Sequence, residues 1–174
     1  MAVAQVAPTG VERVFPDDEI IVSKTDVKGR ITYANAVFLE VSGYTEDEVL
    51  GEPHNMVRHP DMPACIFRLL WETIASGREM FAYVRNMCKN GDHYWVHAHV
   101  TPTRDANGAI VGYHSNRRVP DRSAIAKVEP LYASLLAEEQ RHASHKDGID
   151  AGVALLRATI AATGMTYEEF VWSL

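Results

Sequence analysis

The sequence has few cysteines, no long hydrophobic run and no signal peptide, and each shortage excludes a class of protein. Cys65 and Cys88 lack the spacing of metal-binding pairs, which suits free thiols in a reducing compartment, although a single disulfide stays open. Arg157 interrupts the longest apolar stretch near the C-terminus, far short of the roughly 20 residues that span a bilayer. The start, MAVAQVAPTG, has neither a basic region nor a long apolar core. We therefore expect a cytoplasmic protein without a membrane span.

The sequence also has fewer basic residues than acidic ones. Seventeen Lys and Arg face 23 Asp and Glu, a formal net charge of −6. This balance argues against nucleic acid or an anionic membrane as the main partner. Basic residues gather only locally, at Arg117, Arg118 and Arg122, and a solvated strand end explains them better than a phosphate site.

The chain is long enough for one domain with an appendage. Its 174 residues are 47% hydrophobic, which suffices for a core. The composition changes after Pro16 and again after Pro120. We predict an N-terminal cap over 1–16, a central domain over 17–120 and a helical extension over 121–174.

Hydrophobic periodicity predicts the elements of the central domain. Short strands are predicted near 20–22 and 30–33, followed by a helix over 36–41 that Asn35 can cap. Thr45 and Glu48 then form a capping box. A longer helix follows over 63–75. After Gly77 the period becomes two, which predicts strands over 81–89, 92–104 and 109–118, with Asn90-Gly91 as a hairpin turn. The fold class is α+β, a five-stranded antiparallel sheet with helices on one face, followed by C-terminal helices.

The C-terminal part has helical spacing. Apolar residues from Val128 to Leu136 form one amphipathic helix, and a polar hinge over 141–147 precedes a second helix beginning near Gly148. Thr166 and Glu169 form another capping box before the C-terminus.

The segment PHNMVRHPDMP, residues 53–63, concentrates polar chemistry between prolines. It holds an arginine, two histidines and an aspartate in a stiffened stretch directly after Leu50-Gly51-Glu52. Such a segment suits binding of a polar or anionic ligand.

The element order and several motifs resemble those of PAS sensory domains. These motifs are ITYAN at 31–35, VSGY at 41–44, Leu50-Gly51 and NGDHYWV at 90–96. The segment at 53–63, with Trp71 and KNGDHYWV, looks like the PAS domain of bacterial aerotaxis receptors. The similarity runs from about residue 17 to residue 132.

This resemblance implies a non-catalytic sensor that binds FAD non-covalently and responds to redox state or oxygen. The positions that match the family are Asn35, Arg58, His59, Asp61, Trp71 and Asn86. Arg58 is expected to bind the phosphates, Trp71 to pack against an aromatic ring, and Asn86 to hydrogen-bond a flavin edge. His59 and Asp61 are expected either to bond the ligand or to bond each other and fix the loop.

A wider resemblance to flavin-binding light sensors adds two positions. His54 stands where their photoreactive cysteine lies, so adduct chemistry is expected to be absent. His114 stands where they have a strand glutamine, and its imidazole could bond the flavin or a neighbouring backbone group.

Strand alternation sorts the remaining residues between the two faces of the sheet. If Asn86 faces inward, so do Val84 and Cys88, and the next strand turns Tyr94, Val96, Ala98 and Val100 inward. Trp95, His97 and His99 then lie on the outer face. The N-terminal cap or the C-terminal helices could cover that face, or it could form a dimer interface. His97 and His99 have no third metal ligand at a suitable spacing.

Other functions compete with a flavin sensor. A haem-binding PAS gas sensor could use His59 or His93 as axial ligand, and a PAS domain without cofactor could act as a dimerisation module. An enzyme ranks last, because His54, His59 and Asp61 have no nucleophile or metal motif beside them. The expected partners are a second copy, through the outer sheet face or the terminal helices, and a signalling protein.

Overall fold

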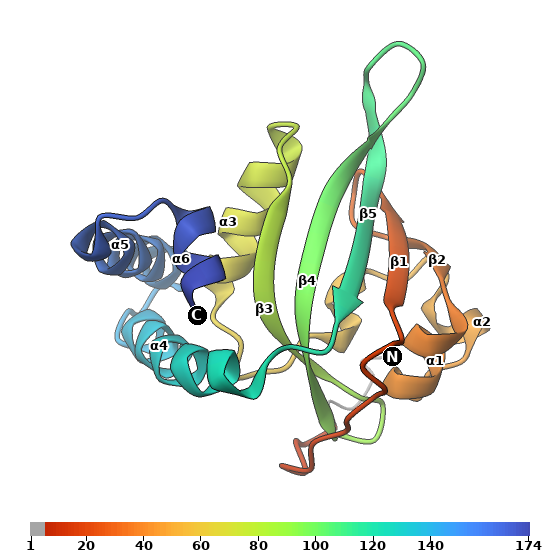
Figure 1. The fold of residues 1–174 in the computed structure, drawn as a ribbon, viewed down its shortest axis with the longest axis horizontal. Helices are drawn as coiled ribbons and strands as arrows, with labels where there is room; N and C mark the ends of the chain where they lie inside the picture. Colours follow the sequence, from red (N-terminus) through yellow and green to blue (C-terminus); the bar gives the residue numbers. More distant parts are fainter. Residues whose placement is uncertain (1–5) are drawn as a thin grey trace.

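A five-stranded antiparallel sheet forms the centre of the computed structural model, which describes residues 6–174 (Figure 1). The strands lie in the order β2-β1-β5-β4-β3. Their bounds are Ile21–Asp26 for β1, Ile31–Ala34 for β2, Met80–Met87 for β3, His93–Arg104 for β4 and Ile110–Arg118 for β5. The predicted fold class is therefore confirmed.

The β3–β4 hairpin sets the register of the sheet edge. Gly91 has a φ of 94° in the turn after Asn90, a conformation that suits glycine. Asn86 pairs with Tyr94 and Ala82 with Ala98, so these residues share one face, as alternation predicts. Trp95 and His97 lie on the other face.

Four short elements connect β2 to β3. They are α1 (Ala36–Ser42), α2 (Glu46–Val49), the 3₁₀-helix η1 (His54–Val57) and α3 (Ala64–Ala75). Asn35 caps α1 by accepting from the Phe38 amide, and the predicted Thr45–Glu48 capping box is present at α2. Two of these elements, η1 and α3, contribute residues to the wall of the cavity described below.

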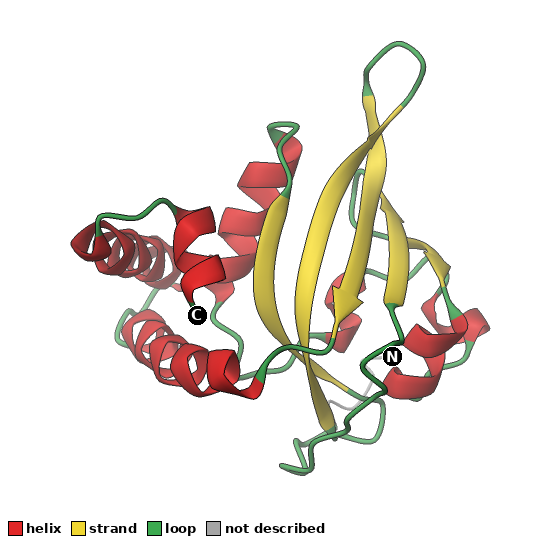
Figure 2. Ribbon diagram, in the orientation of Figure 1, coloured by secondary structure: helices red, strands yellow, loops and turns green. Residues whose placement is uncertain are grey.

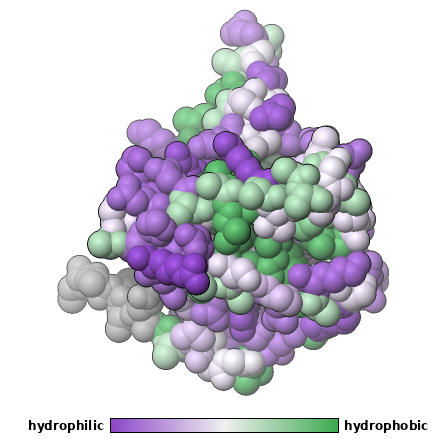
Figure 3. Space-filling view, turned by 90° about the vertical axis from the view of Figure 1, so that its left-hand side faces the viewer, coloured by the Kyte–Doolittle hydropathy of each residue, from purple (hydrophilic) through white to green (hydrophobic). Residues whose placement is uncertain are grey.

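Three C-terminal helices lie beside the β3 edge of the sheet (Figures 1 and 2). They are α4 (Arg122–Gln140), α5 (His145–Thr163) and α6 (Tyr167–Ser173). Helix α5 begins earlier than predicted, because Ser144 caps it by accepting from the Asp147 amide. On the side of the molecule that faces the viewer in Figure 3, apolar residues gather in a hollow bordered by hydrophilic ones. No helix within residues 6–174 is long and apolar enough to cross a membrane.

The C-terminal helices cover part of the outer sheet face. The Trp95 ring lies 6.3 Å from that of Tyr132 in α4, and the His97 ring lies 5.2 Å from Trp172 in α6. The Tyr132 hydroxyl donates to the Tyr83 carbonyl at 2.7 Å. The C-terminal helices, which the sequence indicates as one possible cover, therefore pack against this aromatic face.

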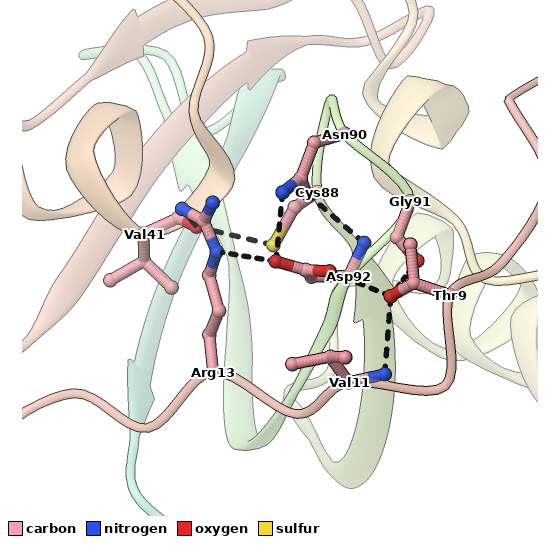
Figure 4. A network of polar contacts seen from close by, with 8 residues as sticks. All are labelled: Thr9, Val11, Arg13, Val41, Cys88, Asn90, Gly91 and Asp92. Atoms are coloured by element: carbon pink, nitrogen blue, oxygen red, sulfur yellow. Dashed lines mark hydrogen bonds and ion pairs between the residues drawn. The ribbon is translucent and has the colours of Figure 1, made fainter.

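The N-terminal segment is fixed to the β3–β4 hairpin (Figure 4). The Asp92 carboxylate accepts from the Thr9 hydroxyl at 2.6 Å and from Arg13 Nε at 3.1 Å. The bonds from Thr9 and Arg13, with one donated by the Asn90 side-chain amide, lower the pKa of Asp92. The three-part division of the chain stays a prediction, and residues 1–5 of the predicted cap lie outside the described part.

Candidate functional site

A cavity of about 540 Å³ lies between the inner sheet face and the helices α3 and η1, within the size range of small-molecule sites. The strands β1, β3, β4 and β5 and the start of α5 also contribute residues to its lining. The polar and aromatic lining residues are Ser23, Thr25, Lys28, His54, Asn55, Arg58, Phe67, Arg68, Trp71, Asn86, Tyr113, Ser115, Arg117 and His145. No lining residue is an aspartate or a glutamate, so the cavity carries positive charge in an acidic protein.

Arg117 of β5 is the most enclosed charge in the cavity. It is 3% exposed, and its Nη2 donates to the Ser23 hydroxyl at 2.6 Å. Its Nη1 has no hydrogen-bond partner among the described residues, and no carboxylate there forms an ion pair with it. Burial lowers the pKa of Arg117 to about 10, which leaves it charged at neutral pH. A buried cation without a counter-ion is costly, so it favours an electron-rich ligand.

His54 of η1 is neutral beside this cation. Its Nε2 lies 2.7 Å from Arg117 Nη2 and 3.0 Å from Ser23 Oγ. Because arginine only donates, Nε2 must accept, which places the imidazole proton on Nδ1. Burial, reinforced by the charge of Arg117, lowers the pKa of His54 to about 3.

An aromatic pair forms another part of the wall. The rings of Trp71 in α3 and Tyr113 in β5 meet edge to face, with centroids 5.4 Å apart. Gly29 allows Trp71 to lie there, since a Cβ at this position would be 2.9 Å from the Trp71 ring. Gly29 also has a φ of 79°, so both the turn and the ring require glycine.

Arg58 connects the loop after η1 to the sheet. Its backbone bridges to Asn86, and its guanidinium donates to the Met62 carbonyl at 3.3 Å and lies 4.3 Å from the Phe67 ring centroid. Burial lowers the pKa of Arg58. Arg58, Arg68 and Lys28 are more exposed than Arg117 and therefore form the outer, cationic part of the lining.

Four of the eight predicted site residues line the cavity and four do not. His54, Arg58, Trp71 and Asn86 line it. The side chain of Asn35 caps α1 by accepting from the Phe38 amide. It also accepts from the Val22 amide and donates to the Ile20 carbonyl, which joins it to the segment around the start of β1. Asn35 is therefore absent from the cavity lining, and its contact with a ligand stays a prediction.

His59 and Asp61 fix the loop, the second of the roles expected for them. His59 is fully buried, and its Nδ1 accepts from the Asp61 amide at 3.1 Å. The Asp61 carboxylate is exposed and pairs with Arg85 at 3.3 Å. The His59 and His93 rings meet edge to face outside the cavity lining, so neither expected haem ligand faces the cavity.

The predicted inward position of His114 is wrong. Tyr113, Ser115 and Arg117 line the cavity, and alternation turns His114 to the opposite face of β5, where it pairs with Lys24 and Thr101. The same alternation shows why the interpretation of Arg117 as part of a solvated strand end was wrong. Arg118 is exposed, whereas Arg117 points inward.

Acid should destabilise the protein through its enclosed histidines. Folded His54 resists protonation down to about pH 3 and folded His59, through burial, down to about pH 4. The unfolded chain takes up these protons near pH 6.5, so stability falls as the pH drops below that value and the penalty is absent above it. The dependence of the free energy of unfolding on pH, measured with urea between pH 7 and pH 5, gives the number of protons taken up on unfolding. His54→Gln should take up about one proton fewer than the wild type. If the free energy of unfolding of His54→Gln depends on pH as steeply as that of the wild type, a neutral His54 is contradicted.

The described residues contain no cluster of three His, Cys, Asp or Glu side chains that could hold a metal ion. Both cysteines are free, buried and absent from the cavity lining. The site is therefore defined by arginine, imidazole, amide and aromatic groups.

The site geometry is a cationic, partly aromatic cavity against a five-stranded sheet, and comparison with known proteins identifies the family of this fold. The PAS fold family matches residues 31–117, which is half of the chain, so the protein belongs to that family. It is 47% identical over 130 residues to the aerotaxis receptor of Escherichia coli strain K12, covering 75% of this chain and 26% of the receptor. The chain thus spans about a quarter of that relative's length. The resemblance to the PAS domain of aerotaxis receptors is confirmed.

Two further similarities are more distant. The nitrogen fixation regulatory protein of Klebsiella pneumoniae is 25% identical over 99 residues, which cover 57% of this chain and 20% of that protein. Among solved structures, the light state of the blue-light photoreceptor Aureochrome1 LOV aligns with a TM-score of 0.56 at 25% identity. That alignment covers 70% of this chain and 91% of the photoreceptor domain.

Proposed function

We propose that this chain is a non-catalytic sensor domain that binds FAD non-covalently in its cavity and relays the flavin's redox state to a partner protein. The similarity to an aerotaxis receptor and to a blue-light photoreceptor domain supports a sensory role. The family resemblance supports a flavin.

The charge of the cavity is the observation that carries this proposal. Lys28, Arg58, Arg68 and Arg117 line it, and no lining residue is an aspartate or a glutamate. Arg68 pairs with Glu72 and Asp150 outside the lining, whereas Arg117 has an N–H group without a partner in the described chain. Apolar and aromatic side chains fill much of the remaining wall. The ligand that fits has a flat ring with electron-rich atoms and an anionic tail, and FAD has both.

The residues suggest a division of roles. Arg117 and Asn86 would offer donors to the oxygen and nitrogen edge of the ring, and Trp71 would pack against the ring. Arg58, Arg68 and Lys28 would meet the phosphates. A bound flavin supplies reversible electron transfer. Because His54 replaces the photoreactive cysteine and no thiol lines the cavity, light-driven adduct formation is not expected.

The spectrum of protein purified without added cofactor tests this function. We expect flavin bands that bleach with dithionite and return in air, and one FAD per chain after heat release and chromatography. A haem Soret band, or a colourless protein that fails to take up added FAD, would contradict the proposal.

The proposal also concerns location and assembly. We place the domain in the cytoplasm, where its free cysteines stay reduced. The chain's own helices occupy the outer face around Trp95 and His97, so we propose that a homodimer would use the terminal helices.

A further inference from the structure

Helix α5 takes part in the cavity although it lies beyond the matched PAS segment. His145 and Ile149, on its first two turns, line the cavity together with residues of α3 and the sheet. From this position we infer that α5 is part of the ligand site, and that ligand binding and docking of the C-terminal helices stabilise each other. The inference rests on the proposed function, because it requires a ligand in this cavity.

Glu139 connects α4 to the start of α3. Its carboxylate accepts from the Ala64 amide at 2.9 Å and from the Cys65 amide at 2.7 Å. Helix α3 has no side-chain cap of its own, since Pro63 stands at the N-cap position. A carboxylate there satisfies two free N–H groups and suits the positive end of the helix dipole. The C-terminal region thus completes the helix that carries Arg68 and Trp71.

Two glycines allow α5 to approach these neighbours closely. A Cβ at Gly148 would lie 2.4 Å from the Glu139 carbonyl oxygen. A Cβ at Gly152 would lie 3.0 Å from the Glu139 side chain and 3.1 Å from Cys65. Ile149 lies between these glycines in sequence. Its position at the cavity therefore depends on tight contact of α5 with α4 and α3.

An ionic contact joins α5 to a lining residue. Arg68 of α3 pairs with Asp150 of α5, which also accepts from Lys146 at 2.8 Å. Arg68 lines the cavity as well. An anionic tail near Arg68 and His145 would contact both helices at once, so the bound ligand should hold α5 against α3.

Coupling of this kind acts in both directions. A ligand that contacts α5 must bind more weakly when α5 is undocked, and it must favour docking by the same factor. Typical couplings correspond to about 5- to 150-fold in affinity. The C-terminal helices would therefore report whether the cavity is filled.

The test compares Glu139→Gln with Glu138→Gln in the full chain. Glu138 is the adjacent control, because it bonds only Arg141 and His142 among the described residues. We expect FAD to slow amide hydrogen exchange in residues 145–163 of the wild type by about fivefold or more. Glu139→Gln should speed this exchange and weaken FAD binding by about fivefold or more, whereas Glu138→Gln should match the wild type.

A second variant makes the test independent of the Glu139 contact. Ile149→Ala removes an apolar contact with the cavity and should also weaken FAD binding. If the wild type binds FAD but exchange in α5 is unchanged and both variants bind normally, the inference is overturned while the proposed function stands. If the wild type binds no FAD, both are overturned.

Discussion

Replacing Arg117 with methionine is expected to weaken FAD binding by roughly 10- to 100-fold, since a hydrogen bond to a charged group contributes about 1.5–3 kcal/mol. The same change should stabilise the cofactor-free protein by about 1–3 kcal/mol, because it removes a buried cation that has no counter-ion in the described chain. Ser23 and His54 would keep each other as partners at 3.0 Å. Urea unfolding without ligand and a fluorescence titration with FAD measure the two effects.

Weaker FAD binding together with higher stability of the cofactor-free protein would separate a binding role of Arg117 from a structural role. If Arg117 served only the fold, Arg117→Met would lower the stability and any loss of affinity would follow from unfolding. Arg118→Met is the matched control, because Arg118 is adjacent and exposed. It should change neither the stability nor the affinity beyond experimental error.

Gly148→Ala is expected to destabilise the protein by about 1–3 kcal/mol, the range for inserting an extra methyl group into a tightly packed contact. An alanine inside a helix normally stabilises it by about 1 kcal/mol relative to glycine. Here the Cβ would lie 2.4 Å from the Glu139 carbonyl oxygen, so the steric cost should exceed the gain in helix propensity. Thermal and urea unfolding measure whether the free energy of unfolding falls or rises in this variant.

The control for this variant lies on the same helix. Arg157→Ala alters an exposed position of α5 and should leave stability nearly unchanged. A gain in stability in Gly148→Ala would mean that α5 does not approach α4 as closely as the structure shows.

The sequence predicted most of the sheet because its signals are local. Asn90-Gly91 marks the hairpin, and the period of two along the last strands requires only neighbouring residues. The inward positions of Val84, Asn86, Ala98 and Val100 followed from the same rule.

The site differs from the prediction where a basic run or a family resemblance conflicts with strand alternation, and where no periodicity exists. The basic run of Arg117, Arg118 and Arg122 suggests a solvated strand end, but alternation from Tyr113 and Ser115 turns Arg117 inward. Resemblance to a glutamine of the flavin-binding light sensors suggests that His114 faces a flavin, but the register of β5 turns it to the opposite face. In the loop at 53–63 no period exists, so sequence could not decide which of Arg58, His59 and Asp61 faces the cavity.

The contribution of α5 could not be predicted at all. Glu139 bonds the amides of Ala64 and Cys65 across a long sequence separation, and the fit depends on the absence of a Cβ at Gly148 and Gly152. Helical periodicity predicts that a helix exists and which face is apolar, but it carries no information about the partner of that face.

Trp71 provides the most direct measurement of ligand in the cavity, because its ring lines the wall and meets Tyr113. Titration of FAD into cofactor-free protein should quench tryptophan fluorescence to saturation at one FAD per chain. Trp71→Phe should lose most of this quenching, whereas Trp172→Phe, altered at an exposed position of α6, should retain it. Quenching that fails to saturate, or that is the same in Trp71→Phe as in the wild type, would contradict a flavin site in this cavity.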